Sequence, residues 1–150
     1  MKILLIGDPH FKTSNRLETD QLFDETKRYL DENEIDLIVV LGDVLDTHEK
    51  IHVQPLCRSI LFIKMLAFYQ KTFVLIGNHD RINNNVYMTD EHPFTSLKNY
   101  NENLVIVDKT VVWNDFYFVP YVPNGRFKEA LGENFENSSA IFAHQEFLGC

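Results

Sequence analysis

Residues 72–80 read Thr-Phe-Val-Leu-Ile-Gly-Asn-His-Asp, an apolar run that passes directly into glycine, an amide, an imidazole and a carboxylate. Short runs rich in Ile, Leu and Val are typical of strands buried on both faces of a parallel sheet. The polar residues then lie beyond the carboxyl end of the strand, where open α/β sheets bind their ligands. This stretch therefore predicts a fold class and a place for a functional site.

Two earlier segments repeat the arrangement. Residues 2–6 are an apolar run followed by Gly7-Asp8-Pro9-His10, and residues 37–41 are followed by Gly42-Asp43. An alternation of such runs with segments of helical length predicts a βαβαβ unit with right-handed crossovers, the start of a doubly wound parallel sheet. The helices are expected at residues 17–33 and 55–70, with Pro55 at the first helical position of the second.

The second half of the chain predicts shorter strands in quick succession. Asn114-Asp115 is a plausible two-residue turn between two of them, which indicates a hairpin. We therefore expect a mixed second sheet packed on the first, so the fold class is a layered α/β sandwich. The expected strands are 104–107, 110–113, 116–119 and 140–143, and short helical segments are expected near 94–99 and 126–131.

Length and composition indicate one ordinary globular domain. The 150 residues are 45% hydrophobic and 24% charged, which excludes disordered and low-complexity classes. A net charge of -8 provides no basic field for nucleic acid, so such a substrate would need bound metal or a partner protein. Two cysteines, Cys57 and Cys150, and the lack of a signal-peptide core or membrane span predict an intracellular protein without membrane association.

Each predicted strand end carries side chains that ligate metals. An isolated Asp-x-His or Gly-Asp is most often an ordinary turn, but four strand ends in order carry oxygen and nitrogen donors. Such a donor set suits a pair of divalent ions. The residues are Asp8, His10, Asp43, Asn78, His79, Asp80 and His144, the last directly after the strand expected at 140–143.

The number and order of these elements resemble the calcineurin-like metallophosphoesterases, whose pattern reads D-x-H, G-D-x-x-D, G-N-H-D, H and G-H-x-H. The match runs from Lys2 to about His144. The resemblance implies two divalent ions, manganese first and iron, zinc or magnesium as alternatives. It further implies that Asp8 and His10 bind one ion, that Asp43 bridges both, and that Asn78 and His144 bind the other. His79 would protonate or stabilise the departing oxygen, and Asp80 would orient the His79 ring.

The resemblance also implies a reaction, the hydrolysis of phosphodiester bonds by a hydroxide activated between the two ions. Within the family the chain looks most like the nuclease branch typified by the SbcD subunit, which implies a DNA substrate, an ATPase partner subunit and a role in DNA repair. Two alternatives remain open: a phosphomonoesterase or cyclic-nucleotide phosphodiesterase, and a catalytically inactive binding module with the same fold.

One departure from the family pattern is clear, because residues 1–150 contain no Gly-His-x-His. We expect residues 1–150 to form the N-terminal part of a metallophosphoesterase domain that lacks the last ligand motif, unless another chain supplies it. The segment 55–70 is apolar nearly all round, which predicts either a sandwiched helix or a homodimer interface. His48, His52, Arg81 and His92 are candidate substrate contacts, although solvated or capping roles are more common for such residues.

Overall fold

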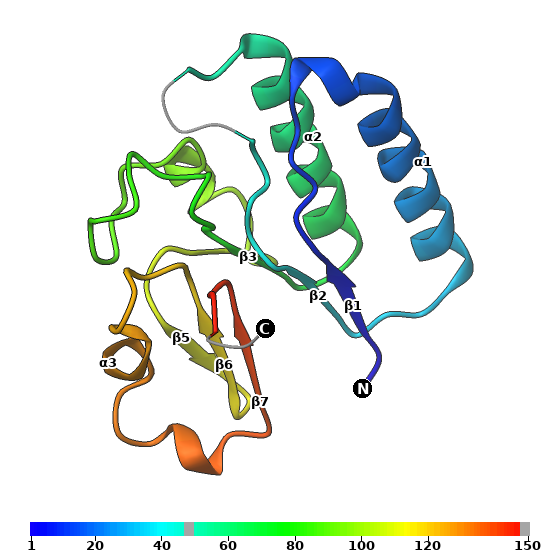
Figure 1. Cartoon of the computed structure of the whole chain (residues 1–150). Coiled ribbons are helices and arrows are strands. Elements are labelled where there is room, and N and C mark those ends of the chain that lie inside the picture. The colour runs from blue at the N-terminus through cyan, green and yellow to red at the C-terminus, as the bar shows by residue number, and fades with distance from the viewer. Residues whose placement is uncertain (47–49, 148–150) are drawn as a thin grey trace.

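The structure is a computed structural model that describes residues 1–46 and 50–147. Four parallel strands form one sheet in the order β1-β2-β3-β4, and three strands form a second sheet in the order β5-β6-β7 (Figure 1). The first-sheet strands are β1 (Ile3–Ile6), β2 (Leu37–Val40), β3 (Thr72–Leu75) and β4 (Leu104–Val107), and the second-sheet strands are β5 (Val111–Trp113), β6 (Phe116–Val119) and β7 (Ala140–Ala143). The helices are α1 (Arg16–Glu32), α2 (Val53–Tyr69) and α3 (Phe127–Leu131), with 3₁₀ turns at Thr13–Asn15, Thr95–Leu97 and Phe135–Asn137.

The first sheet is the middle layer of the molecule. Helices α1 and α2 cover one face of it, and the β5-β6-β7 sheet lies against the other (Figure 1). Strand β2 is apolar throughout because all of its residues are fully buried. Ile38 and Val40 pack with the helices, whereas Leu37 and Val39 pack toward the second sheet. Period-two alternation thus places consecutive residues in two separate cores.

Aromatic rings join the two sheets. Phe73 of β3 stacks on Phe118 of β6 with ring centroids 3.8 Å apart, and Phe118 stacks in turn near Phe142 of β7 at 5.2 Å. Trp113 lies 5.7 Å from Phe73 and extends the cluster to β5. Helix α3 packs on the outer side of the second sheet, where Leu131 contacts the cluster around Val119. The mixed sheet is therefore a layer between the parallel sheet and α3, with Val112 and Ile141 of its strands left exposed.

The predicted fold class is confirmed, with local differences. Strand β6 pairs antiparallel with β5 and parallel with β7, so the second sheet is mixed as expected. Asn114 and Asp115 form the predicted hairpin turn with φ of 47° and 63°, the left-handed values that a type I′ turn needs. The strand expected at 104–107 joins the parallel sheet as β4. Pro55 occupies the third position of α2, still within the first turn, where its missing N–H leaves no bond unmade.

The strand ends converge because β1, β2 and β3 run parallel in matched register. Beyond β1, the backbone N–H of Phe11 donates to the carbonyl of Val44 at 2.7 Å, so the loops that follow β1 and β2 lie side by side. The N–H of His144 donates to the carbonyl of Val119 at 3.3 Å, which fixes the residue that follows β7.

Helix α2 has two apolar faces. Phe62 and Leu66 are fully buried beneath it, whereas Leu61 and Phe68 are 52% and 81% exposed. The sandwiched-helix interpretation therefore holds for one face only. Within residues 1–46 and 50–147, no helix combines the length and the apolar character needed to cross a membrane.

We predict that Phe118→Ala lowers the free energy of unfolding by about 3–5 kcal/mol, because it opens a cavity between the two sheets at a fully buried ring. Phe68→Ala is the matched control, since this ring is 81% exposed and its loss is expected to change stability by less than about 0.5 kcal/mol. Urea denaturation of both variants measures the difference, and equal losses would contradict the assignment of Phe118 to the core.

Candidate metal centre

The buried carboxylate of Asp43 lies at the centre of the candidate site. Its Oδ1 accepts a hydrogen bond of 2.9 Å from the backbone N–H of His79 and lies 3.4 Å from Nε2 of His144. Its Oδ2 lies 3.8 Å from Nε2 of His10 and 3.9 Å from Nε2 of His79. The three imidazole contacts are longer than ordinary hydrogen bonds. Each oxygen of the carboxylate therefore faces nitrogen donors across a gap.

His144 presents a lone pair to this gap. Its Nδ1 lies 2.8 Å from the carbonyl oxygen of Leu41, and its Nε2 lies 2.8 Å from Oδ1 of Asn78. A neutral imidazole carries one proton, so donation from Nδ1 to the carbonyl leaves Nε2 as an acceptor. Because the amide oxygen of Asn78 is turned toward His144, the lone pair on Nε2 of His144 faces the side-chain oxygens of Asn78 and Asp43. Three converging lone pairs repel one another unless a cation lies among them, so this donor set fits a metal ion.

His10 forms the other side of the centre. Its Nδ1 is buried without a hydrogen-bond partner, although Oδ1 of Asp46 lies 3.3 Å away. Its ring meets the ring of His79 edge to face, with centroids 5.3 Å apart. Two ligand atoms that each lie about 2.1 Å from the same ion are about 3.0 Å apart when the ligand–metal–ligand angle is a right angle and about 3.4 Å apart when it is tetrahedral. Wider ligand–metal–ligand angles give the longer separations found around Asp43. The residues present thus fit ions on both sides of Asp43.

Asp8 lies closer to His144 than the predicted ligand sets suggest. Its Oδ1 is 3.7 Å from Nδ1 of His144, and Asp8, Asp43 and His144 offer ligand atoms that all lie within 4.8 Å of one another. Asp8 and His10 have φ of 39° and 45°. The turn is therefore not the extended backbone in which alternate residues share a face, which is why sequence spacing did not predict the side on which Asp8 lies.

Two glycines leave room for the centre. A Cβ on Gly77 would lie 2.2 Å from Oδ1 and 2.3 Å from the backbone nitrogen of Asp43. A Cβ on Gly42 would lie 2.5 Å from Nδ1 of His144, and Gly42 also has φ of +104°, a value that L side chains rarely adopt. The glycines of both motifs are thus explained by close approach to the site rather than by turn geometry alone.

Asp80 braces the loop that carries Asp43. Its Oδ2 accepts from the N–H groups of Val44 at 3.1 Å and Gly77 at 3.0 Å, and its Oδ1 accepts from Leu45 at 2.8 Å. The pKa of Asp80 is raised to about 6, chiefly by burial and to a smaller extent by nearby Asp43, while the three N–H donors oppose the rise. Both carboxylate oxygens of Asp80 thus accept from backbone donors, and its role in orienting the His79 ring stays a prediction.

The group that faces His79 is Asp46. Its carbonyl oxygen lies 2.8 Å from Nδ1 of His79, so Nδ1 carries a proton and Nε2 faces the centre. The His79 side chain is one-third exposed. An imidazole whose ring is held at Nδ1 can exchange a proton with a substrate through Nε2.

Residues 1–145 match the family model described as calcineurin-like phosphoesterase. The chain belongs to this family. Two curated relatives come from invertebrate iridescent viruses. "Putative phosphoesterase 078R" of Invertebrate iridescent virus 3 is 43% identical over 100% of this chain and 46% of its own length. "Putative phosphoesterase 244L" of Invertebrate iridescent virus 6 is 41% identical over 99% of this chain and 55% of its own length. The chain thus spans about half the length of the curated relatives it matches.

A solved structure shares the fold. The crystal structure of the nuclease MPE of Pseudomonas putida is similar with a TM-score of 0.51 and 23% sequence identity, over 78% of this chain and 52% of that one. At this identity the similarity shows the fold alone. It agrees with the layered sandwich described above.

Of the remaining candidates, Arg81 is unsuited to a surface contact with phosphate. Arg81 is 3% exposed, and its guanidinium donates to the carbonyl oxygens of Tyr121 and Val86. His92 is also buried, with Nε2 3.2 Å from Oδ2 of Asp108, and burial lowers its pKa. His52 is exposed, and His48 lies outside the described residues.

Sequence reasoning missed the supporting groups of this candidate centre. Asp46 was visible as the second Asp of Gly-Asp-x-x-Asp, but its contact with His79 is made by a backbone carbonyl that no residue type reveals. The contact between the Leu41 carbonyl oxygen and Nδ1 of His144 is likewise made by the backbone and cannot be predicted from residue type. Such partners orient the ligating rings and tune their basicity.

We predict that Gly77→Ala weakens Mn²⁺ binding about tenfold or more, because the new methyl group displaces the Asp43 carboxylate. It should also cost about 1–3 kcal/mol of stability through overpacking. Gly7→Ala is the matched control: nothing lies within 4 Å of its Cβ position. Isothermal titration and thermal unfolding measure both effects, and equal Mn²⁺ affinities for the two variants would refute the close-approach explanation.

Proposed function

We propose that this chain provides the metal-binding half of a phosphodiesterase that acts on nucleic acid. The observation that carries the proposal is the Asp43 carboxylate, whose two oxygens face different imidazoles across gaps of 3.4–3.9 Å. Family membership and relatives named as phosphoesterases support a phosphoester substrate. The similarity of fold to a protein described as a nuclease favours a diester of nucleic acid over a monoester.

The proposed ion sites lie on either side of Asp43. His10 would serve the Oδ2 side, and Asn78 and His144 would serve the Oδ1 side, with Asp8 near His144. Two divalent ions, of which we favour manganese, supply Lewis-acid activation of water and neutralise charge on the phosphoryl group. They would also bring the formal charge of -8 halfway to zero, which relieves the repulsion of a phosphate substrate.

His79 has the geometry of a proton donor to the departing oxygen. The Asp46 carbonyl holds Nδ1, and Nε2 points toward the centre 3.9 Å from Asp43. An imidazole near neutral pH supplies a proton to an alkoxide that would otherwise leave slowly. In this role His79 transfers a proton and does not bind metal, and Asp80 acts indirectly by fixing the Asp43 loop.

Further protein components remain predictions. The exposed Leu61 and Phe68 on α2 are compatible with the predicted homodimer. The ATPase partner and the DNA repair role follow from the resemblance to the SbcD-type branch alone, and the intracellular location was predicted from the low cysteine content. The histidines of the absent Gly-His-x-His would come from outside residues 1–150, one for each ion.

We expect the natural full-length protein with Mn²⁺ to hydrolyse bis-p-nitrophenyl phosphate faster than p-nitrophenyl phosphate, and Asp43→Asn to abolish both activities. Asp24→Asn on exposed α1 surface is the matched control. His79→Ala should lower kcat by about 10²–10⁴-fold, and more for a dinucleotide than for the p-nitrophenyl diester, because an alkoxide depends most on a proton donor.

Faster cleavage of the monoester would favour the phosphomonoesterase alternative. No turnover of either ester would favour the inactive binding module.

We also predict that residues 1–150 bind Mn²⁺ less tightly than the full-length protein, because one histidine donor of each site is missing from them. Isothermal titration of both forms measures stoichiometry and affinity. Two tight sites on residues 1–150 alone would refute the proposal that ligands come from elsewhere, and His144→Ala should remove the binding that remains on the Oδ1 side.

A further inference from the structure

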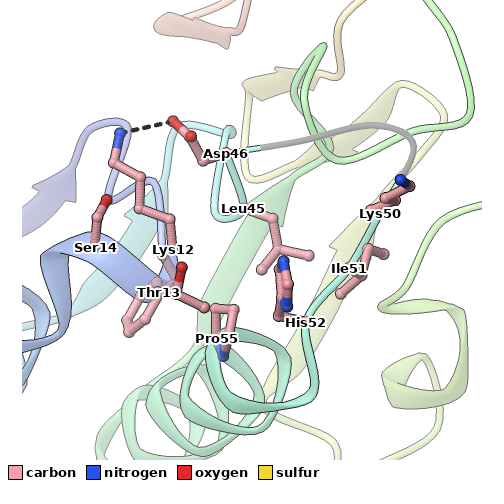
Figure 2. A pocket seen from close by; sticks show the side chains of 10 residues that line it. Lys12, Thr13, Ser14, Leu45, Asp46, Lys50, Ile51, His52 and Pro55 are labelled. Atoms are coloured by element: carbon pink, nitrogen blue, oxygen red, sulfur yellow. Dashed lines mark hydrogen bonds and ion pairs between the residues drawn. The ribbon is translucent and has the colours of Figure 1, made fainter.

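A cavity of about 230 Å³ lies beside the metal centre, at the start of α2 (Figure 2). Its inner wall is formed by Phe11 and Leu45, both almost fully buried and joined by a parallel β-bridge. Pro55 of α2 also lines it, and His52 lies beside that proline in Figure 2. An apolar wall with a neighbouring imidazole suits a flat ring that is partly hydrophobic.

The rim of this cavity is positively charged, in contrast to the chain as a whole. Lys12, Lys50 and His52 line it, and the acidic residue among its lining side chains is Asp46. Nζ of Lys12 lies 3.1 Å from Oδ1 of Asp46, as the dashed line in Figure 2 marks. Lysines at the rim of a cavity beside the proposed centre suit the phosphate of an anionic ligand.

The cavity and the metal centre share a wall. Asp46 lines the cavity, while its carbonyl oxygen lies 2.8 Å from Nδ1 of His79 and its Oδ1 lies 3.3 Å from Nδ1 of His10. Ile51 lines this cavity and also a second one, which His79 lines as well. A group bound in the first cavity is therefore separated from the proposed proton donor by a single residue.

From this geometry we infer that the cavity is a subsite for one nucleotide of a polynucleotide strand, next to the phosphodiester that is cleaved. The base lies against Pro55 and His52, and Lys12 at the rim pairs with the adjoining phosphate. The volume lies below the range of about 300–1,000 Å³ that holds drug-sized ligands, so it accepts one ring system rather than a longer segment. This inference rests on the proposed function and adds a substrate contact to it.

Ser14 provides a way to fill the cavity without touching the metal centre. Ser14 lines the cavity from the 3₁₀ turn Thr13–Asn15 and is exposed. Ser14→Trp should occupy the space of the base. Leu17→Trp adds the same ring one turn away, at a side chain that is 81% exposed and outside the cavity. Ser14→Ala keeps the cavity open.

The test is binding and cleavage of a short single-stranded oligothymidylate by the natural full-length protein, compared with cleavage of bis-p-nitrophenyl phosphate. We expect Ser14→Trp to weaken oligothymidylate binding, measured by fluorescence anisotropy, about tenfold or more, the loss expected when one stacked base is displaced. Its kcat/KM for bis-p-nitrophenyl phosphate should stay within about twofold of the unmodified protein, because a change remote from the reacting atoms leaves the chemical step intact. Leu17→Trp and Ser14→Ala should change neither oligothymidylate binding nor kcat/KM for bis-p-nitrophenyl phosphate.

Unchanged oligothymidylate binding in Ser14→Trp overturns the subsite and leaves the phosphodiesterase proposal intact. An equal loss for the oligonucleotide and the p-nitrophenyl diester also overturns it, since the tryptophan then acts on the centre itself. Absence of all hydrolysis overturns the proposed function instead, and the anisotropy measurement still decides the subsite.

Discussion

The buried carboxylate of Asp43 sets the conditions for the rest of this structure. A charge withdrawn from water needs opposite charge or hydrogen-bond donors close by. The backbone N–H of His79 supplies one such donor, while Asp80, whose pKa burial raises to about 6, adds a second acidic group close by. The surrounding imidazoles lie at distances that suit metal coordination better than hydrogen bonding. Divalent cations would offset this imbalance, and the strand ends bring candidate ligands for them together.

Backbone strain accompanies this arrangement. Asp8, His10 and Asp43 all have positive φ, a conformation that non-glycine residues adopt at a cost and usually at functional sites. Asp80 offsets part of that cost through its bonds to Val44, Leu45 and Gly77, which hold the Asp43 loop in one conformation. The most buried residue of the Gly-Asn-His-Asp motif therefore serves the site through the backbone rather than through the reacting atoms.

The second sheet contributes to the centre through one residue. Stacking of Phe73 on Phe118 fixes the mixed sheet against the parallel one, and β7 pairs with β6 so that His144 reaches the Leu41 carbonyl beyond β2. Without that layer, the Oδ1 side of Asp43 would lose its nitrogen donor. Core packing and ligand geometry are thus coupled across the interface between the sheets, which is why a ligand more than sixty residues from Asn78 lies beside it.

The sequence by itself determined the βαβαβ start, the mixed second sheet, the strand-end positions of the candidate ligands and the family resemblance, because periodicity and motif order are local properties of the chain. It did not determine how those ligands are divided around Asp43, nor the role of Asp80. Asp8 lies near His144 because of a left-handed turn, and Asp46 faces His79 through its carbonyl oxygen. Turn conformation and backbone hydrogen bonds depend on which loops meet in space, so only the tertiary structure decided them. The cavity beside α2 also depends on the tertiary structure, because its walls come from three separate segments that no sequence pattern brings together.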